Sequence, residues 1–114
     1  MWKIEKVNAF IQKELGSILL KEVDLFPGIL LTITRVDTSS NLIESKVYIS
    51  ILPEDKEKEV MDLLNRKIYF IQQFLNKKLK IRPVPKIIFK RENKTAEASR
   101  IEELLREIDK KKEM

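Results

Sequence analysis

One segment of the sequence concentrates the residue types that contact phosphate. Residues 66–91, RKIYFIQQFLNKKLKIRPVPKIIFKR, contain nine Lys or Arg residues and no Asp or Glu. By contrast, residues 1–65 carry 8 basic and 11 acidic groups, whereas residues 66–100 carry 11 basic and 2 acidic ones. Positive charge concentrated in this way indicates a polyanionic partner more strongly than the overall net charge of +5 does.

The basic segment also has an apolar pattern with helical spacing, which predicts one buried face. The apolar residues are Leu64, Ile68, Ile71, Leu75 and Leu79. The opposite face then carries cations interleaved with an amide and aromatic rings, a combination that suits phosphate contact and base stacking. We therefore predict a nucleic-acid-binding surface made of Arg66, Lys67, Gln73, Lys77, Lys78, Lys80, Arg82, Lys90 and Arg91.

A simpler explanation is that surface helices carry lysine for solubility. That explanation is the better one for any single lysine of the segment. It is weaker for the whole segment, because solvated faces usually mix the two signs of charge.

Catalytic residue types are scarce in this sequence. There is no His and no Cys, and no serine has an obvious base partner. Neither a P-loop nor a dinucleotide fingerprint occurs, and no spacing of carboxylates suggests a metal site. We expect a binding protein that is not an enzyme and uses no cofactor or metal.

Composition fits one soluble domain spanning residues 1–114. The chain is 43% apolar, which is enough to bury one core. The first residues, MWKIEKVNAF, do not resemble a signal peptide, and no apolar run approaches the ~18 residues of a membrane span. We expect a cytoplasmic protein without membrane contact.

The elements that would position the basic segment can be predicted from periodicity. A helix over 3–24 precedes strands over 29–37 and 42–52, which the turn Ser39–Asn41 joins into a hairpin. In the second strand, Ile43, Ser45, Val47, Ile49 and Ile51 alternate with polar residues and are predicted to face the core.

A helical region then runs from Pro53 to about Lys80. A bend near Asn65–Lys67, with Asn65 as a helix cap, is slightly favoured over a straight helix, because a straight helix would be long for this domain. A strand over 86–90 and a last helix follow, and residues 110–114 form a frayed tail. The result is an α+β domain with a three-stranded sheet and helices packed on one face.

Three strings resemble the bacterial ribosome-binding factor A family. They are KVNAFIQKELGSILLKEV, VDTSSNLIESKVYISIL and FIQQFLNKKLKIRPVPKIIFKRENKTAEASRIEELL. The resemblance implies a type II KH-like domain, helix-strand-strand-helix-helix-strand, with a C-terminal helix. It also implies a ribosome assembly factor, monomeric off the ribosome, that binds the small (30S) subunit through 16S rRNA. Such a factor assists late maturation of the subunit, including processing of the rRNA 5′ end.

The sequence departs from the family pattern at several positions. The family's Asp-Pro-Arg after the first helix is DLFPG here, and the Arg of its F-I-R motif is Gln72, which removes one phosphate contact that the family pattern would imply. Lys67, Ile68 and Tyr69 stand where the family has Ala-x-Gly. No glycine follows Gly28, so a glycine-rich loop that clamps single-stranded RNA is not expected.

Two hypotheses from different classes remain open at this point. In the first, the domain binds rRNA through its basic middle, and binding weakens steeply with salt. In the second, it is a KH-like protein-interaction module without specific RNA binding, whose association with its partner is insensitive to salt.

Overall fold

The computed structural model describes residues 3–25 and 27–92. The order of elements in this part of the chain is helix-strand-strand-helix-helix-strand, which confirms the predicted order. The elements are α1 (Ile4–Glu22), β1 (Leu30–Thr38), β2 (Glu44–Leu52), a 3-10 turn (Glu54–Lys56), α2 (Glu57–Arg66), α3 (Ile68–Lys78) and β3 (Lys86–Arg91). The predicted last helix and the predicted frayed tail lie outside the described residues.

The sheet is mixed, with the strand order β1-β2-β3. β1 pairs antiparallel with β2, and β3 pairs parallel with β2. The parallel pairing requires a long crossover, which α2 and α3 provide. The register of β1 and β2 shifts between Ile33 and Arg35, so Thr34 forms a bulge there.

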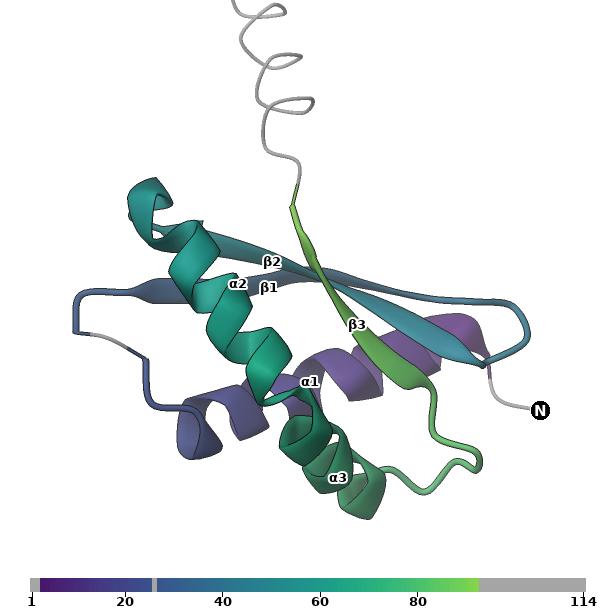
Figure 1. Ribbon diagram of the computed structural model, residues 1–114. Helices are drawn as coiled ribbons and strands as arrows, with labels where there is room; N and C mark the ends of the chain where they lie inside the picture. The colour runs from purple at the N-terminus through teal and green to yellow at the C-terminus, as the bar shows by residue number, and fades with distance from the viewer. Residues whose placement is uncertain (1–2, 26, 93–114) are drawn as a thin grey trace, which may run out of the picture.

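The three helices lie on one side of the sheet (Figure 1), as predicted. On β2, Ser45, Val47, Ile49 and Ile51 are all buried beneath them, which confirms the alternation read from the sequence. Ile43, predicted to share that face, is 64% exposed because it lies in the turn before β2 begins. The sequence pattern alone could not show where the turn ends and the strand begins.

The turn between β1 and β2 is shaped by the side chain of Asn41. Its Oδ1 accepts hydrogen bonds from the Ser39 hydroxyl at 2.6 Å and from the Ile43 amide at 3.1 Å. These bonds close an Asx-type turn, in which a short side-chain oxygen substitutes for a backbone acceptor.

The helical region after Pro53 is interrupted at Lys67, which confirms the predicted bend near Asn65–Lys67. Lys67 has φ −99° and ψ 5°, and its amide still bonds to the carbonyls of Leu63 and Leu64. The predicted cap at Asn65 is wrong. Asn65 lies within α2, the N-cap position of α3 is Lys67, and no side chain caps α3.

Candidate nucleic-acid interface

Helix α3 presents one apolar face to the core and one polar face to solvent. Ile71 and Leu75 are buried, whereas Gln73, Lys77 and Lys78 are exposed. Because the helix repeats every 3.6 residues, Gln73 and Lys77 lie on the face opposite Ile71 and Leu75, as the sequence predicted. Lys78 lies seven residues after Ile71 and so at nearly the same angle around the axis, and it is exposed at the C-terminal end of the helix. Lys80 is exposed just beyond the end of α3, so it extends the same cationic surface.

The lysines of this surface have no anionic partners among the described residues. Lys77, Lys78 and Lys80 form no ion pair there, and the Lys77 ammonium lies 5.9 Å from the centre of the Phe74 ring. Glu14 of α1 lines a hollow together with Lys78 and Lys80, but it is not bonded to either. We call Lys77, Lys78 and Lys80 the α3 lysine cluster.

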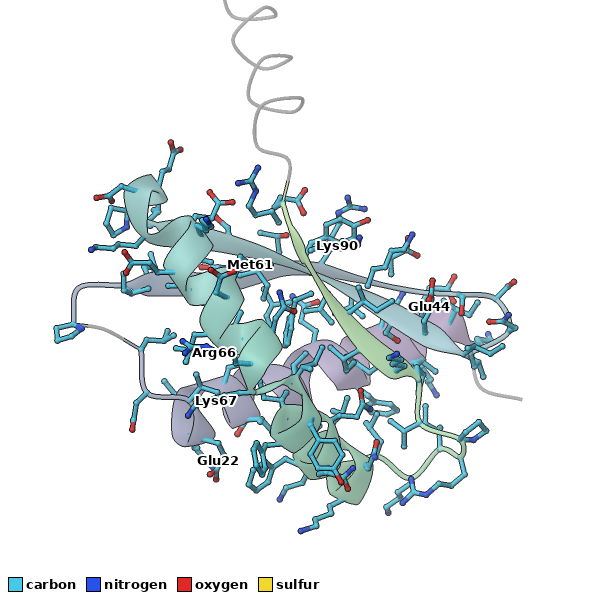
Figure 2. The ribbon with its side chains drawn as sticks, viewed as in Figure 1. Glu22, Glu44, Met61, Arg66, Lys67 and Lys90 are labelled. Carbon is cyan, nitrogen blue, oxygen red and sulfur yellow. The ribbon has the colours of Figure 1, made fainter. Side chains whose placement is uncertain are left out.

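Arg66 and Lys67 lie at the junction of α2 and α3 (Figure 2). Arg66 is exposed and borders a shallow hollow that Glu59, Asp62 and Asn65 also line. The two carboxylates reduce the positive potential around Arg66. Lys67 is half-buried and has no side-chain hydrogen bond or ion pair with any described residue. Lys67 lines a hollow with Glu22 of α1, so each cation of the junction has a carboxylate nearby but no ion pair.

Two of the predicted contact residues use their guanidinium groups within the protein. Arg82 donates from Nη1 to the carbonyls of Leu79 (2.6 Å) and Ile81 (2.8 Å), and from Nη2 to that of Asn76 (3.1 Å). It thereby ties the end of α3 to the segment that follows. Arg91 Nε lies 2.9 Å from a carboxylate oxygen of Glu57 at the start of α2. Both arginines keep fewer donors for phosphate than an unpaired side chain would.

Lys90 lies on a different face from the α3 lysine cluster. Ile87 and Phe89 of β3 point into the core, so Lys90, which follows Phe89 in the strand, points to the helix-free face of the sheet. Figure 2 shows Lys90 far from Lys67 in the same view. The structure therefore does not bring all the predicted contact residues onto one surface.

The helix-free face carries its own charge network. The Arg35 guanidinium lies 3.7 Å from the centre of the Tyr48 ring, and its Nε is 3.3 Å from Glu92 Oε2, which also accepts from the Thr34 hydroxyl at 2.8 Å. Desolvation lowers the pKa of Arg35, but the hydrogen bond and Coulomb attraction to Glu92 outweigh it and raise the pKa above its ordinary value. This face mixes both signs, so it is a poorer match to a polyanion.

Gln72 has a role that the sequence did not reveal. Its Oε1 accepts from the Ile87 amide at 2.8 Å, and its Nε2 donates to the carbonyl of Pro85 at 3.1 Å and to Asn76 Oδ1 at 3.0 Å. These bonds join α3 to the start of β3. Gln73, the neighbouring amide that was predicted as a contact, is exposed and makes none of them.

No three His, Cys, Asp or Glu side chains among residues 3–25 and 27–92 gather closely enough to hold a metal ion. In the same part of the chain, no helix combines the length and the apolar character that crossing a bilayer would need. The described residues form a basic surface on α3 next to the exposed rings of Tyr69 and Phe70. The lysines can contact phosphates, and the rings can stack on bases.

Comparison with known proteins places this fold in a family. Residues 3–105 match the family model described as Ribosome-binding factor A. A Ribosome-binding factor A from Chlorobium phaeovibrioides is 36% identical over 113 residues, which span 95% of this chain and 92% of that protein. Another from Lactobacillus acidophilus is 34% identical over 110 residues, spanning 95% of this chain and 91% of that protein.

Solved structures show the same fold. The crystal structure of ribosome-binding factor A from Thermus thermophilus superposes with a TM-score of 0.66 at 22% identity, covering 79% of this chain and 97% of that one. A Thermus thermophilus homology model fitted into a cryo-EM map of a 30S complex gives a TM-score of 0.64 at 23% identity, covering 78% and 93%. The KH-like α+β fold is therefore shared, and the chain belongs to the ribosome-binding factor A family.

Proposed function

We propose that the protein is an assembly factor that docks on the small (30S) ribosomal subunit through 16S rRNA. The observation that carries this proposal is the α3 lysine cluster, three exposed cations at and just beyond the C-terminal end of α3 that have no described anionic partner. Its position supports contact with phosphates, which attract lysine as point charges and release counterions on binding. The complex of the Thermus thermophilus relative with the 30S subunit supports the same partner.

In this proposal the factor works by binding and performs no chemistry itself. It acts in the cytoplasm as a monomer and assists late maturation of the subunit, including processing of the 16S rRNA 5′ end. Contacts come from Lys67, Gln73 and the α3 lysine cluster, with Arg66 at the margin. Arg82 contributes mainly by holding the segment that follows α3, and Arg91 by pairing the end of β3 with the start of α2. Lys90 contributes little because it faces the other side of the sheet.

Sedimentation of cell lysate on a sucrose gradient tests the proposed partner. The purified protein is added at low salt, and its distribution is followed through the gradient. We expect it in the small-subunit fraction, with release as salt rises because phosphate contacts are lost. Confinement to the top of the gradient at low salt would count against this function.

The runner-up is a protein-interaction module, and one observation favours it. β1 is an edge strand, and a hollow of about 470 Å³ lies between it and α1. Leu20 and Leu30 line that hollow and are 83% and 59% exposed. An unpaired strand edge next to apolar side chains can accept a strand from another chain. That function predicts association that persists at high salt and no affinity for RNA.

A further inference from the structure

A second, smaller hollow opens where the end of α1 meets the α2–α3 junction. Its volume is about 170 Å³, below the roughly 300–1,000 Å³ of pockets for drug-sized ligands. It suits a single planar ring system better than a helix or an extended peptide. The lining residues are Glu22, Val23, Lys67, Phe70, Ile71 and Phe74.

The floor of the hollow is apolar and its wall is aromatic. Val23 and Ile71 are 5% and 2% exposed, whereas Phe70 is 65% exposed. The Phe70 ring lies edge-on to the equally exposed ring of Tyr69, with the centroids 5.9 Å apart and an interplanar angle of 80°. Adjacent aromatic rings left so open to water are a recognition feature, because burying them against a flat partner gains stacking and removes apolar surface from solvent.

The rim of the hollow carries one anion and one cation, Glu22 and Lys67. Figure 2 shows both at this end of the molecule. Neither side chain forms a hydrogen bond or ion pair with the other or with any other described residue. Both groups are therefore available to a ligand. A carboxylate only accepts hydrogen bonds, so Glu22 requires donors, whereas Lys67 requires an acceptor or a phosphate.

A nucleobase meets these requirements, and guanine meets them best. Guanine presents two neighbouring donors, N1–H and the N2 amino group, which match the two oxygens of one carboxylate. Uracil presents a single N–H between two carbonyl oxygens, which would lie close to the carboxylate. An unpaired base can also stack on the Phe70 ring while Lys67 contacts its phosphate.

We propose that this hollow binds one unpaired nucleobase of the RNA, with a preference for guanine. The inference rests on the proposed function and specifies part of the RNA that the basic surface contacts. RNA is favoured over a protein side chain because the adjoining α3 surface is cationic, and the Lys67 ammonium at the rim would oppose an apolar occupant. The base would be held beside the α2–α3 junction, through side chains that are not neighbours in the sequence.

The test uses two unstructured RNA oligomers of the same length, one all uridine and one with a single central guanosine. Affinity for the full chain is measured by fluorescence anisotropy at fixed low salt. We expect the guanosine oligomer to bind about tenfold more tightly, within the range for a bidentate contact to a base edge. Replacing that guanosine by inosine, which lacks the N2 amino group, should reduce the preference.

Glu22→Gln should reduce the guanosine preference to about twofold or less, because the amide replaces one acceptor oxygen by a donor. The uridine oligomer should bind at least as tightly as before, because a negative charge beside the RNA is removed. Glu5→Gln, an exposed change of the same kind in the first turn of α1, should leave the preference intact. Phe70→Ala should weaken binding of both oligomers, through loss of stacking.

Equal affinities for the two oligomers, or a preference that survives Glu22→Gln, would overturn the inference. If the protein still sediments with small subunits in either case, the proposed function stands and only the base-binding hollow fails. If the protein binds neither oligomer nor small subunits, the proposed function fails and the hollow fails with it. Tighter binding of both oligomers after Phe70→Ala would also contradict a stacking role.

Discussion

At the scale of single residues, two adjacent glutamines of α3 have different surroundings and different roles. Gln73 lies on the polar face of α3, where helical spacing placed it. Gln72 stands where the family pattern has arginine, so the pattern alone predicts only the loss of a phosphate contact. The structure shows instead that its amide joins α3 to β3. That role depends on where the chain returns after α3, which periodicity does not encode.

Replacing each glutamine by alanine separates the two roles. Gln72→Ala leaves the partly buried Ile87 amide and Pro85 carbonyl without partners, so we expect the free energy of unfolding to fall by about 1–3 kcal/mol. Gln73→Ala is the matched control and should change it by no more than about 0.5 kcal/mol. Urea denaturation followed by circular dichroism measures both. Similar losses in the two variants would contradict the assigned role of Gln72.

A buried hydroxyl pair offers a second test at this scale. The Thr38 and Ser45 hydroxyl oxygens are 2.7 Å apart, and both residues are buried. Removing one hydroxyl leaves the other unsatisfied, whereas removing both does not. We expect Ser45→Ala and Thr38→Val each to lower the free energy of unfolding by about 1–2 kcal/mol.

The double variant should then be more stable than the sum of the two losses predicts. The coupling free energy from the double-mutant cycle should be about 1 kcal/mol or more. Losses that add without coupling would mean that each hydroxyl finds another partner when its neighbour is removed.

At the scale of elements, periodicity located the helices and strands because one face of each meets the core. The break at Lys67 was also predictable, since an unbroken helix would be too long for the domain. The residue at which β2 begins could not be predicted, because Ile43 is apolar and in phase with the strand although it lies in the turn. Likewise, the internal bonds of Arg82 could not be predicted, because they depend on the path of the chain after α3.

The missing cap on α3 has a measurable consequence. The first amides of a helix have no partner within the helix, and no side chain supplies one at Lys67. We expect the amides of Ile68, Tyr69 and Phe70 to exchange with solvent about tenfold faster, or more, than that of Leu75. The Lys67 amide should be better protected than these three, because it bonds to two carbonyls of α2.

Hydrogen exchange followed by NMR resolves these amides individually. Uniform strong protection from Val60 to Leu75 would contradict the break and would indicate one continuous helix. Protection that is low at Lys67 itself and high at Tyr69 would place the break earlier than the structure has it.

At the scale of the whole molecule, the two faces of the domain differ in charge. The helical side carries the α3 lysine cluster without a described anionic partner, whereas the sheet side mixes Arg35 and Lys90 with Glu92. The sequence predicted one basic surface over residues 66–91, because a linear count cannot tell which face each residue joins. The hollow beside Lys67 could not be predicted either, since Glu22 and Phe70 meet there only after folding.

We propose that the protein binds the small subunit through the α3 lysine cluster. Binding to purified small subunits is therefore compared between two triple variants with the same change in charge. The first is Lys77→Glu, Lys78→Glu and Lys80→Glu on the helical side. The matched control is Lys46→Glu, Lys86→Glu and Lys90→Glu, at positions that alternate with the buried residues of β2 and β3 and therefore lie on the sheet side. Thermal melting must show that both variants remain folded.

Cosedimentation over a series of salt concentrations gives the affinity and its salt dependence. We predict that the helical-side variant loses affinity by tenfold or more and that its slope of log affinity against log salt falls by about two to three, as the loss of three phosphate contacts requires. The sheet-side variant should lose much less affinity and keep the slope of the parent protein. An equal loss in both variants, or a greater loss in the sheet-side variant, would contradict the claim that this protein binds through α3.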